Sequence, residues 1–167
     1  NNQIHSTAVI EPGAQIADDV SIGPFSFIGS DVILHSGVQI KSHVVVTGMT
    51  EIGEKTVIYP FAVIGEIPQD LKFEGEKTNL KIGKRNQIRE HVTINTGTEL
   101  GGGLTSIGND CLFMTGSHVA HDVEIKNKVI IANCGAVAGH CVIEDDVIIG
   151  GLSGIHQFVR IGRGAII

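Results

Sequence analysis

Aliphatic residues recur at every sixth position along almost the whole chain. The first run consists of Ile4, Ile10, Ile16, Ile22, Ile28, Leu34, Ile40, Val46, Ile52, Ile58 and Ile64. The series resumes in phase with Ile82, Ile88 and Ile94, slips by one residue within Gly101–Gly103, and continues from Ile107 to Ile167. A helix has a period of 3.6 residues and a strand a period of two, so neither accounts for this spacing. It is typical of a hexapeptide repeat.

A hexapeptide repeat predicts an all-β fold, a parallel β-helix. Each repeat supplies one short strand and one bend, and three repeats form a triangular coil of roughly 18 residues. We expect the aliphatic residue of each hexapeptide, here called the repeat residue, to point into the interior. Residues 1–167 are therefore predicted to form a single β-helix domain with two loops, at about 66–81 and 95–106, where the series is interrupted. The second loop contains four glycines but lacks the Lys-Ser/Thr ending of a phosphate-binding loop, so we interpret it as a mobile corner loop.

Composition and charge exclude several classes of protein. The apolar residues, 42% of the chain, are interleaved with polar ones and form no run that could span a bilayer. A net charge of -6 argues against nucleic acid as a partner. The sequence shows no secretory signal, and we interpret its three cysteines as reduced packing residues of a cytoplasmic protein. Because Ile167 is itself a repeat residue, we expect a missing C-terminal segment or another chain to cover the end of the interior.

Four histidines are predicted to gather on one edge of the β-helix. At 18 residues per coil, His121 lies over Gly139 and then Gln157, Asp122 lies over His140, and His118 shares a column with Ala136 and Gly154. His156 lies beside Gln157. The remaining histidines, His5, His35, His43 and His91, are expected to be scattered and solvated.

Two kinds of chemistry fit this cluster. A histidine beside a carboxylate can act as a general base, and the backbone N–H of Gly139 could stabilise an oxyanion. Alternatively, histidines from different coils could bind zinc, as in hexapeptide-repeat carbonic anhydrases, although His118 and His121 are poorly spaced on a flat strand for that purpose. The third interpretation is polar surface decoration without chemistry.

Several motifs resemble one family. They are Gly65-Glu66, Gln69-Asp70-Leu71-Lys72-Phe73, Gly75-Glu76, Gly101-Gly102-Gly103-Leu104-Thr105, His118-Val119-Ala120-His121-Asp122, Ala138-Gly139-His140 and His156-Gln157-Phe158. Together they are similar to the acyl-carrier-protein–UDP-N-acetylglucosamine O-acyltransferases of lipid A biosynthesis, over essentially the whole chain. The loop Gln69–Lys72 combined with His118-x-x-His121-Asp122 is the most specific part of this resemblance.

The resemblance implies an activity and a role for each site residue. His121 would deprotonate the 3-hydroxyl of UDP-N-acetylglucosamine, which attacks the thioester of an (R)-3-hydroxyacyl group on acyl carrier protein. Asp122 would orient His121, and the N–H of Gly139 would bind the oxyanion. The residues implied to hold the substrates are Gln69, Asp70, Lys72, His118, His140, His156 and Gln157. The resemblance also implies a left-handed coil, a homotrimer with sites between subunits, and no metal or cofactor.

The sequence departs from the family in three respects, one being that the residues that usually measure acyl length lie at or just past the last coil. Members continue into a helical C-terminal domain that is absent from these residues, and Asn95 stands where many relatives have histidine. A sister N-acyltransferase of the same pathway is an alternative, but it should carry an N-terminal uridine-binding domain, for which a series beginning at Ile4 leaves no room.

Overall fold

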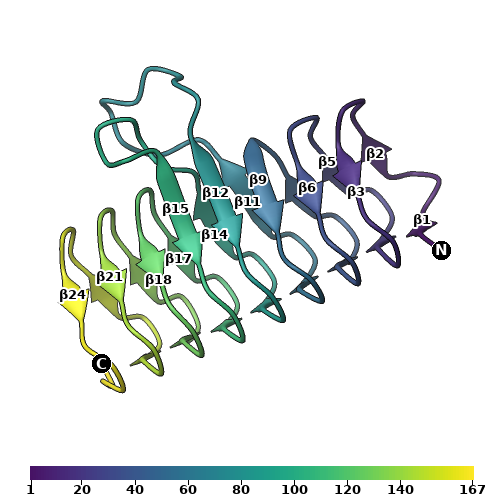
Figure 1. Cartoon of the computed structure of the whole chain (residues 1–167). Coiled ribbons are helices and arrows are strands. Elements are labelled where there is room, and N and C mark those ends of the chain that lie inside the picture. Colours follow the sequence, from purple (N-terminus) through teal and green to yellow (C-terminus); the bar gives the residue numbers. More distant parts are fainter.

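The computed structural model describes all residues from Asn1 to Ile167 and consists of strands, bends and loops (Figure 1). It contains no helix long and apolar enough to cross a membrane. The strands form three parallel sheets of eight strands each, which wind around a common interior. The chain runs along this coil from the N-terminal end to the C-terminal end, as Figure 1 shows.

The three sheets, here called A, B and C, take every third strand in turn. Sheet A contains β1 (Gln3–Ile4), β4 (Ser21–Ile22), β7 (Gln39–Ile40), β10 (Val57–Ile58), β13 (Gln87–Ile88), β16 (Leu112–Phe113), β19 (Ile130–Ile131) and β22 (Ile148–Ile149). Sheet B contains β2 (Val9–Ile10), β5 (Phe27–Ile28), β8 (Val45–Val46), β11 (Val63–Glu66), β14 (Thr93–Asn95), β17 (His118–Val119), β20 (Ala136–Val137) and β23 (Gly154–Ile155). Sheet C contains β3 (Gln15–Ile16), β6 (Ile33–Leu34), β9 (Met49–Ile52), β12 (Asn79–Ile82), β15 (Leu104–Ile107), β18 (Glu124–Ile125), β21 (Val142–Ile143) and β24 (Arg160–Ile161).

The repeat residues form the interior, as the sequence predicts. Every one from Ile22 to Ile161 belongs to a single cluster of 33 buried hydrophobic residues. The terminal ones are more open: Ile4 is 42% exposed and Ile167 is 51% exposed. Removing these side chains from water is the main driving force for stacking the coils.

The interior columns continue across both interruptions. Ser21 pairs with Gln39 at the ordinary spacing of one coil, whereas Ile52 pairs with Ile82 and Ile82 pairs with Ile107. The extra residues leave the coil as two loops, at 67–78 and 96–103, which project from the same side of the β-helix (Figure 1). The expected loops at 66–81 and 95–106 are thus too long, because β12 and β15 continue the sheet C ladder into them.

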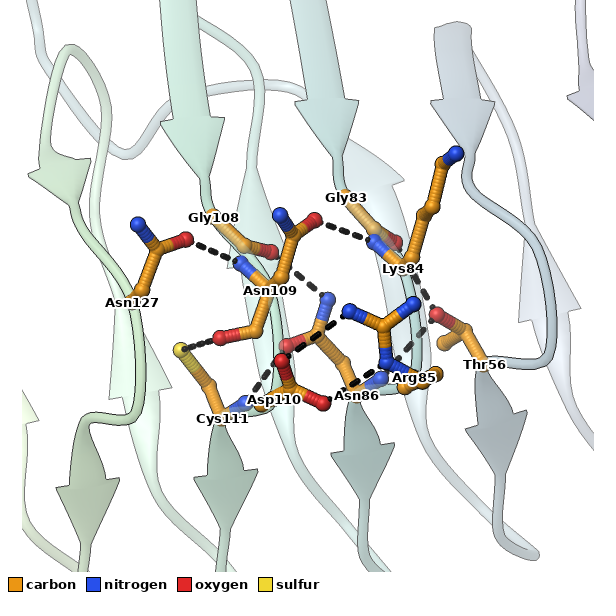
Figure 2. Close-up of polar contacts among 10 residues, drawn as sticks. All are labelled: Thr56, Gly83, Lys84, Arg85, Asn86, Gly108, Asn109, Asp110, Cys111 and Asn127. Carbon is orange, nitrogen blue, oxygen red and sulfur yellow. Dashed lines mark hydrogen bonds and ion pairs between the residues drawn. The ribbon is translucent and has the colours of Figure 1, made fainter.

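Buried side-chain hydrogen bonds stabilise the corner between sheets C and A, here called corner CA (Figure 2). Asn86 is fully buried; its Nδ2 donates to the carbonyl of Gly108 at 2.8 Å, and its Oδ1 accepts from the N–H of Cys111 at 2.8 Å. On the outer surface, Asn109 Oδ1 accepts from the N–H of Lys84 at 2.7 Å. Asparagine side chains therefore satisfy backbone groups that the strand ladders leave free at this corner.

Replacing Asn86 by leucine is expected to lower the free energy of unfolding by about 2–4 kcal/mol, because it leaves the Gly108 carbonyl and the Cys111 N–H buried without partners. Urea unfolding followed by circular dichroism measures this loss. The matched control is Asn109→Ala, which removes one exposed hydrogen bond and should cost less than about 1 kcal/mol. Equal losses in the two variants would contradict the assignment.

The three cysteines differ in environment. Cys111 and Cys141 are buried and pack as the sequence predicts, whereas Cys134 is exposed, so the packing interpretation is wrong for that residue. Burial raises the pKa of the Cys111 thiol to about 11 and also raises the pKa of Cys141. Both thiols therefore stay protonated and inaccessible near neutral pH.

An aromatic disulfide that reacts with accessible thiols is expected, at pH 8, to modify one thiol in the folded protein and all three after unfolding in urea. Cys134→Ser should reduce the folded count to zero. Rapid reaction of a second thiol in the folded protein would show that Cys111 or Cys141 is more accessible than the structure indicates.

Candidate active site

The candidate site lies at the corner between sheets B and C, here called corner BC. Asp122, His140 and Phe158 occupy the same position in three successive corners, and each has a left-handed backbone with φ of 61°, 64° and 63°. The predicted stacking is confirmed by the sheet B register, in which His118 pairs with Ala136 and Ala136 pairs with Gly154. The regular coil therefore brings residues from three segments of the chain to one edge.

His121 and Asp122 form a hydrogen-bonded pair. His121 Nδ1 lies 2.8 Å from Asp122 Oδ2, and the two side chains are only 7% and 1% exposed. A carboxylate at this distance accepts a proton carried by Nδ1, which leaves a lone pair on Nε2. The pair thus presents a base at Nε2.

The Asp122 carboxylate is held by a residue that the sequence analysis did not select, Thr98. The N–H of Thr98 donates to Oδ1 at 2.8 Å, and the hydroxyl of Thr98 donates to Oδ2 at 2.6 Å. Thr98 belongs to the loop at 96–103 and is 5% exposed. The prediction of a mobile corner loop is therefore wrong for the first half of this loop, which is buried and hydrogen-bonded.

Gly139 packs directly against the His121 ring. A Cβ added to Gly139 would lie 2.5 Å from His121 Cε1 and 2.7 Å from Nε2. The Gly139 N–H donates to no group of the protein, whereas the N–H of Asn127, at the equivalent place in corner CA, donates to Asp145 Oδ1 at 2.8 Å. A free backbone donor therefore lies in the same corner as the candidate base.

The other two histidines of the cluster have distinct environments. His118 in β17 lies with Nδ1 at 2.7 Å from the hydroxyl of Thr93, and burial lowers its pKa, so its imidazole is neutral at pH 7. His140 Nδ1 lies 3.9 Å from Asp122 Oδ2. Its ring stacks on Phe158 with centroids 4.4 Å apart and meets the edge of His121 at 4.9 Å.

A groove of about 690 Å³ joins this corner to the loop at 67–78. Seven of the predicted site residues line it: Gln69, Asp70, Lys72, His118, His121, Gly139 and Gln157. Small and aliphatic residues form part of its wall, namely Leu71, Ala120, Ala136, Val137, Ala138, Gly154 and Ile155. His156 does not line the groove; it is exposed, with its Nδ1 at 3.3 Å from the carbonyl of Gln157. Asp122 and His140 do not line the groove either; both contact His121.

His121, Asp122 and His140 also form the one group whose ligand atoms lie close enough together to consider a metal ion, within 4.8 Å of one another. A zinc site needs its nitrogen and oxygen ligands about 2 Å from the metal. Here the Asp122 oxygens already accept hydrogen bonds from His121 and from both donors of Thr98. This arrangement fits a hydrogen-bonded dyad better than a zinc site.

The remaining histidines are not all scattered. His43 and His91 alternate with Phe25 and Phe61 in one exposed row at the corner between sheets A and B, with successive ring centroids 5.2, 5.2 and 5.3 Å apart. Both histidines are exposed, as predicted, but the prediction that they are scattered is wrong, because they occupy the same corner position in successive coils. His35 pairs instead with Glu51 at 2.7 Å.

Comparison with known proteins identifies the family. The family model described as bacterial transferase hexapeptide (six repeats) matches residues 13–48. The acyl-[acyl-carrier-protein]–UDP-N-acetylglucosamine O-acyltransferase of Agrobacterium fabrum is 47% identical over 165 residues, which cover 99% of this chain and 61% of that protein. The protein of the same name from Paracoccus denitrificans is 70% identical over 111 residues, 66% of this chain and 42% of that protein. The chain belongs to the UDP-N-acetylglucosamine O-acyltransferase family.

Solved structures agree with this assignment. LpxA from Acinetobacter baumannii is 48% identical, with a TM-score of 0.94 over 98% of this chain and 66% of that one. UDP-N-acetylglucosamine acyltransferase from Campylobacter jejuni is 40% identical, with a TM-score of 0.94 over 98% of this chain and 64% of that one. The fold is the left-handed parallel β-helix that the repeat and the resemblance predict. The matched region spans 61% of the length of the Agrobacterium relative and 42% of the Paracoccus relative, less than two thirds of either.

Proposed function

We propose that this chain carries the acyl-transfer site of an enzyme that moves an (R)-3-hydroxyacyl group from acyl carrier protein to the 3-hydroxyl of UDP-N-acetylglucosamine, the first step of lipid A biosynthesis. The observation that carries the proposal is the His121–Asp122 dyad, whose Nε2 side packs against Gly139, a residue with a free N–H, in the wall of a large groove. The names of the similar proteins supply the substrates.

The proposed reaction needs one base and one oxyanion donor. His121 Nε2 takes the proton of the sugar hydroxyl while the oxygen attacks the thioester carbonyl. The Gly139 N–H donates to the oxyanion of the tetrahedral intermediate. Collapse of the intermediate breaks the carbon–sulfur bond, and the departing thiolate recovers the proton from His121. A thioester is already activated, so no covalent enzyme intermediate, metal or cofactor enters the scheme.

The other groove residues are proposed to hold the substrates. Asp70 and Lys72 project from the loop at 67–78, where Asp70 Oδ1 accepts from the N–H of Lys72 at 3.0 Å, and Gln69 lies beside them. His118 and Gln157 line the same groove from the coil side. His140 packs against His121 and is proposed to support the dyad. The exposed His156 is proposed to lie next to the nucleotide part of the sugar nucleotide. We further propose that the enzyme works in the cytoplasm as a homotrimer, with its grooves between subunits.

An acyl-transfer assay tests the proposal. Metal-stripped protein is incubated with UDP-N-acetylglucosamine and (3R)-hydroxyacyl carrier protein, and the chain is compared with a version extended at its C-terminus to the length of its relatives. Transfer by either version supports the proposal. An extended version that transfers only to the 3-amino sugar analogue would indicate a different acceptor. Silence in both versions, together with zinc in the untreated protein, would favour the carbonic anhydrase alternative.

A further inference from the structure

The loop at 96–103, here called the glycine loop, closes over the Asp122 carboxylate. We propose that Thr98 is a positioning residue: it fixes the orientation of the Asp122 carboxylate, which in turn holds the proton on His121 Nδ1 and leaves Nε2 free as the base. In this assignment the glycine loop holds the dyad in place through the hydrogen bonds of Thr98 to Asp122. The catalytic consequence rests on the proposed function, whereas the positioning itself is a property of the folded chain.

Thr98 satisfies both oxygens of a buried anion. Its N–H binds Asp122 Oδ1 at 2.8 Å and its hydroxyl binds Oδ2 at 2.6 Å, the same oxygen that faces His121 Nδ1. The Asp122 side chain is 1% exposed, so water cannot replace these donors. The N–H of Gly101 donates to the Thr98 hydroxyl oxygen at 3.2 Å, which turns the hydroxyl hydrogen toward Asp122.

Two glycines let the loop backbone approach the carboxylate. A Cβ at Gly101 would lie 2.3 Å from Asp122 Oδ2, and a Cβ at Gly97 would lie 2.4 Å from the backbone N of Leu104 as well as 2.8 Å from Asp122 Oδ1. Neither residue has a left-handed backbone, so space is the reason for glycine at both positions. By contrast, a Cβ at Gly102 or Gly103 meets nothing, and their φ values of 104° and 79° show that these two serve the backbone turn.

Donors from outside the dyad are needed because an aspartate does not fix its own orientation. Rotation about the terminal bond of the side chain is broad and roughly two-fold, so the carboxylate plane is set by its hydrogen-bond partners. The Asp122 N–H donates to Thr105 Oγ1 at 2.8 Å, which fixes the backbone at this corner and leaves the carboxylate itself to Thr98. Loss of the Thr98 hydroxyl would leave His121 as the only hydrogen-bond donor to Oδ2 and let the plane rotate away from its present orientation.

Three variants test the proposal. Thr98→Val keeps the shape of the side chain and the backbone donor but removes the hydroxyl, Thr98→Ser restores the hydroxyl, and Leu100→Ala alters the 89% exposed tip of the same loop as a control. The first readout is the imidazole Nδ1–H proton of His121, observed by NMR in ¹⁵N-histidine-labelled protein and assigned by its loss in His121→Gln. We expect a slowly exchanging signal in the parent, Thr98→Ser and Leu100→Ala proteins, and fast exchange in Thr98→Val.

The second readout is steady-state acyl transfer by the extended version of the chain. Thr98→Val is expected to lower kcat about 10- to 100-fold, the range found when a hydrogen bond that orients a metal-bound histidine is removed, with KM for the sugar nucleotide unchanged. Thr98→Ser should recover most of kcat. An unchanged His121 signal or an unchanged kcat in folded Thr98→Val would overturn the proposal.

The two readouts separate this proposal from the proposed function. If the parent protein transfers no acyl group, the His121 signal still decides whether Thr98 positions the dyad. If Thr98→Val loses its β-structure by circular dichroism, Thr98→Ala removes the same hydroxyl without adding a contact and replaces it in both measurements. A His121 proton in Thr98→Ala that exchanges as slowly as in the parent would then overturn the proposal.

Discussion

Replacing His121 by alanine is expected to lower kcat for acyl transfer by about 10²–10⁴-fold, the contribution of a positioned general base. The side chain lies at corner BC, outside the cluster of 33 buried hydrophobic residues, so the β-helix should remain folded. Asp122 keeps both donors of Thr98 after the change, which spares the protein an unpartnered buried charge. The measurement is kcat at saturating sugar nucleotide, with thermal unfolding followed by circular dichroism.

His43→Ala is the matched control for this experiment. His43 is an exposed corner histidine that stacks between Phe25 and Phe61 and does not line the groove, so its removal should leave kcat unchanged. A His121→Ala protein that is folded and as active as His43→Ala would refute the proposed mechanism.

A methyl group at Gly139 is expected to lower kcat about 100-fold or more, because it displaces the His121 ring. The added Cβ would lie 2.5 Å from His121 Cε1 and 2.7 Å from Nε2, well inside van der Waals contact, and a displacement of about 1 Å can cost 10² in rate. Gly139 does not have a left-handed backbone, so any loss of stability in the alanine variant should come from moving the His121 ring and not from backbone strain. Kinetics and thermal unfolding of Gly139→Ala, measured side by side, test both expectations.

Gly29→Ala controls for the general effect of adding a methyl group at a corner of the β-helix. Gly29 likewise lacks a left-handed backbone, and a Cβ there would lie no closer than 3.4 Å to its neighbours, the Cα and Oγ1 of Thr47, which is ordinary van der Waals contact. This variant should retain the parent kcat and stability. If Gly139→Ala behaved in the same way, the close packing of Gly139 against the base would have no catalytic importance.

The repeat makes part of the site predictable from the order of the residues alone. Each coil of roughly 18 residues must return the interior side chain to the same column, so residues at that spacing are stacked by geometry. This rule places His118 over Ala136 and Gly154, and the register confirms it. The same rule applies to Phe25, His43 and Phe61, which form a stacked row although we expected the histidine to be scattered.

The structure was needed wherever the chain leaves the repeat. Thr98 and Asp122 are 24 residues apart with an insertion between them. The rule that residues about 18 positions apart are stacked therefore does not bring these two together. Only the path of the glycine loop shows that its backbone packs against the carboxylate and that it is not a free corner loop. Likewise, the limits of both loops depended on whether β12 and β15 would extend their ladder with sheet C.

The sequence by itself determined the β-helix, its interior and the column of candidate site residues, because a periodic series of aliphatic side chains can be buried in only one register. The tertiary structure alone decided how the His121–Asp122 dyad is held, which N–H groups are left free and which loop residues reach the groove. Those features depend on non-periodic segments whose backbone is fixed by hydrogen bonds to distant residues. A repeat of six residues carries no information about such contacts.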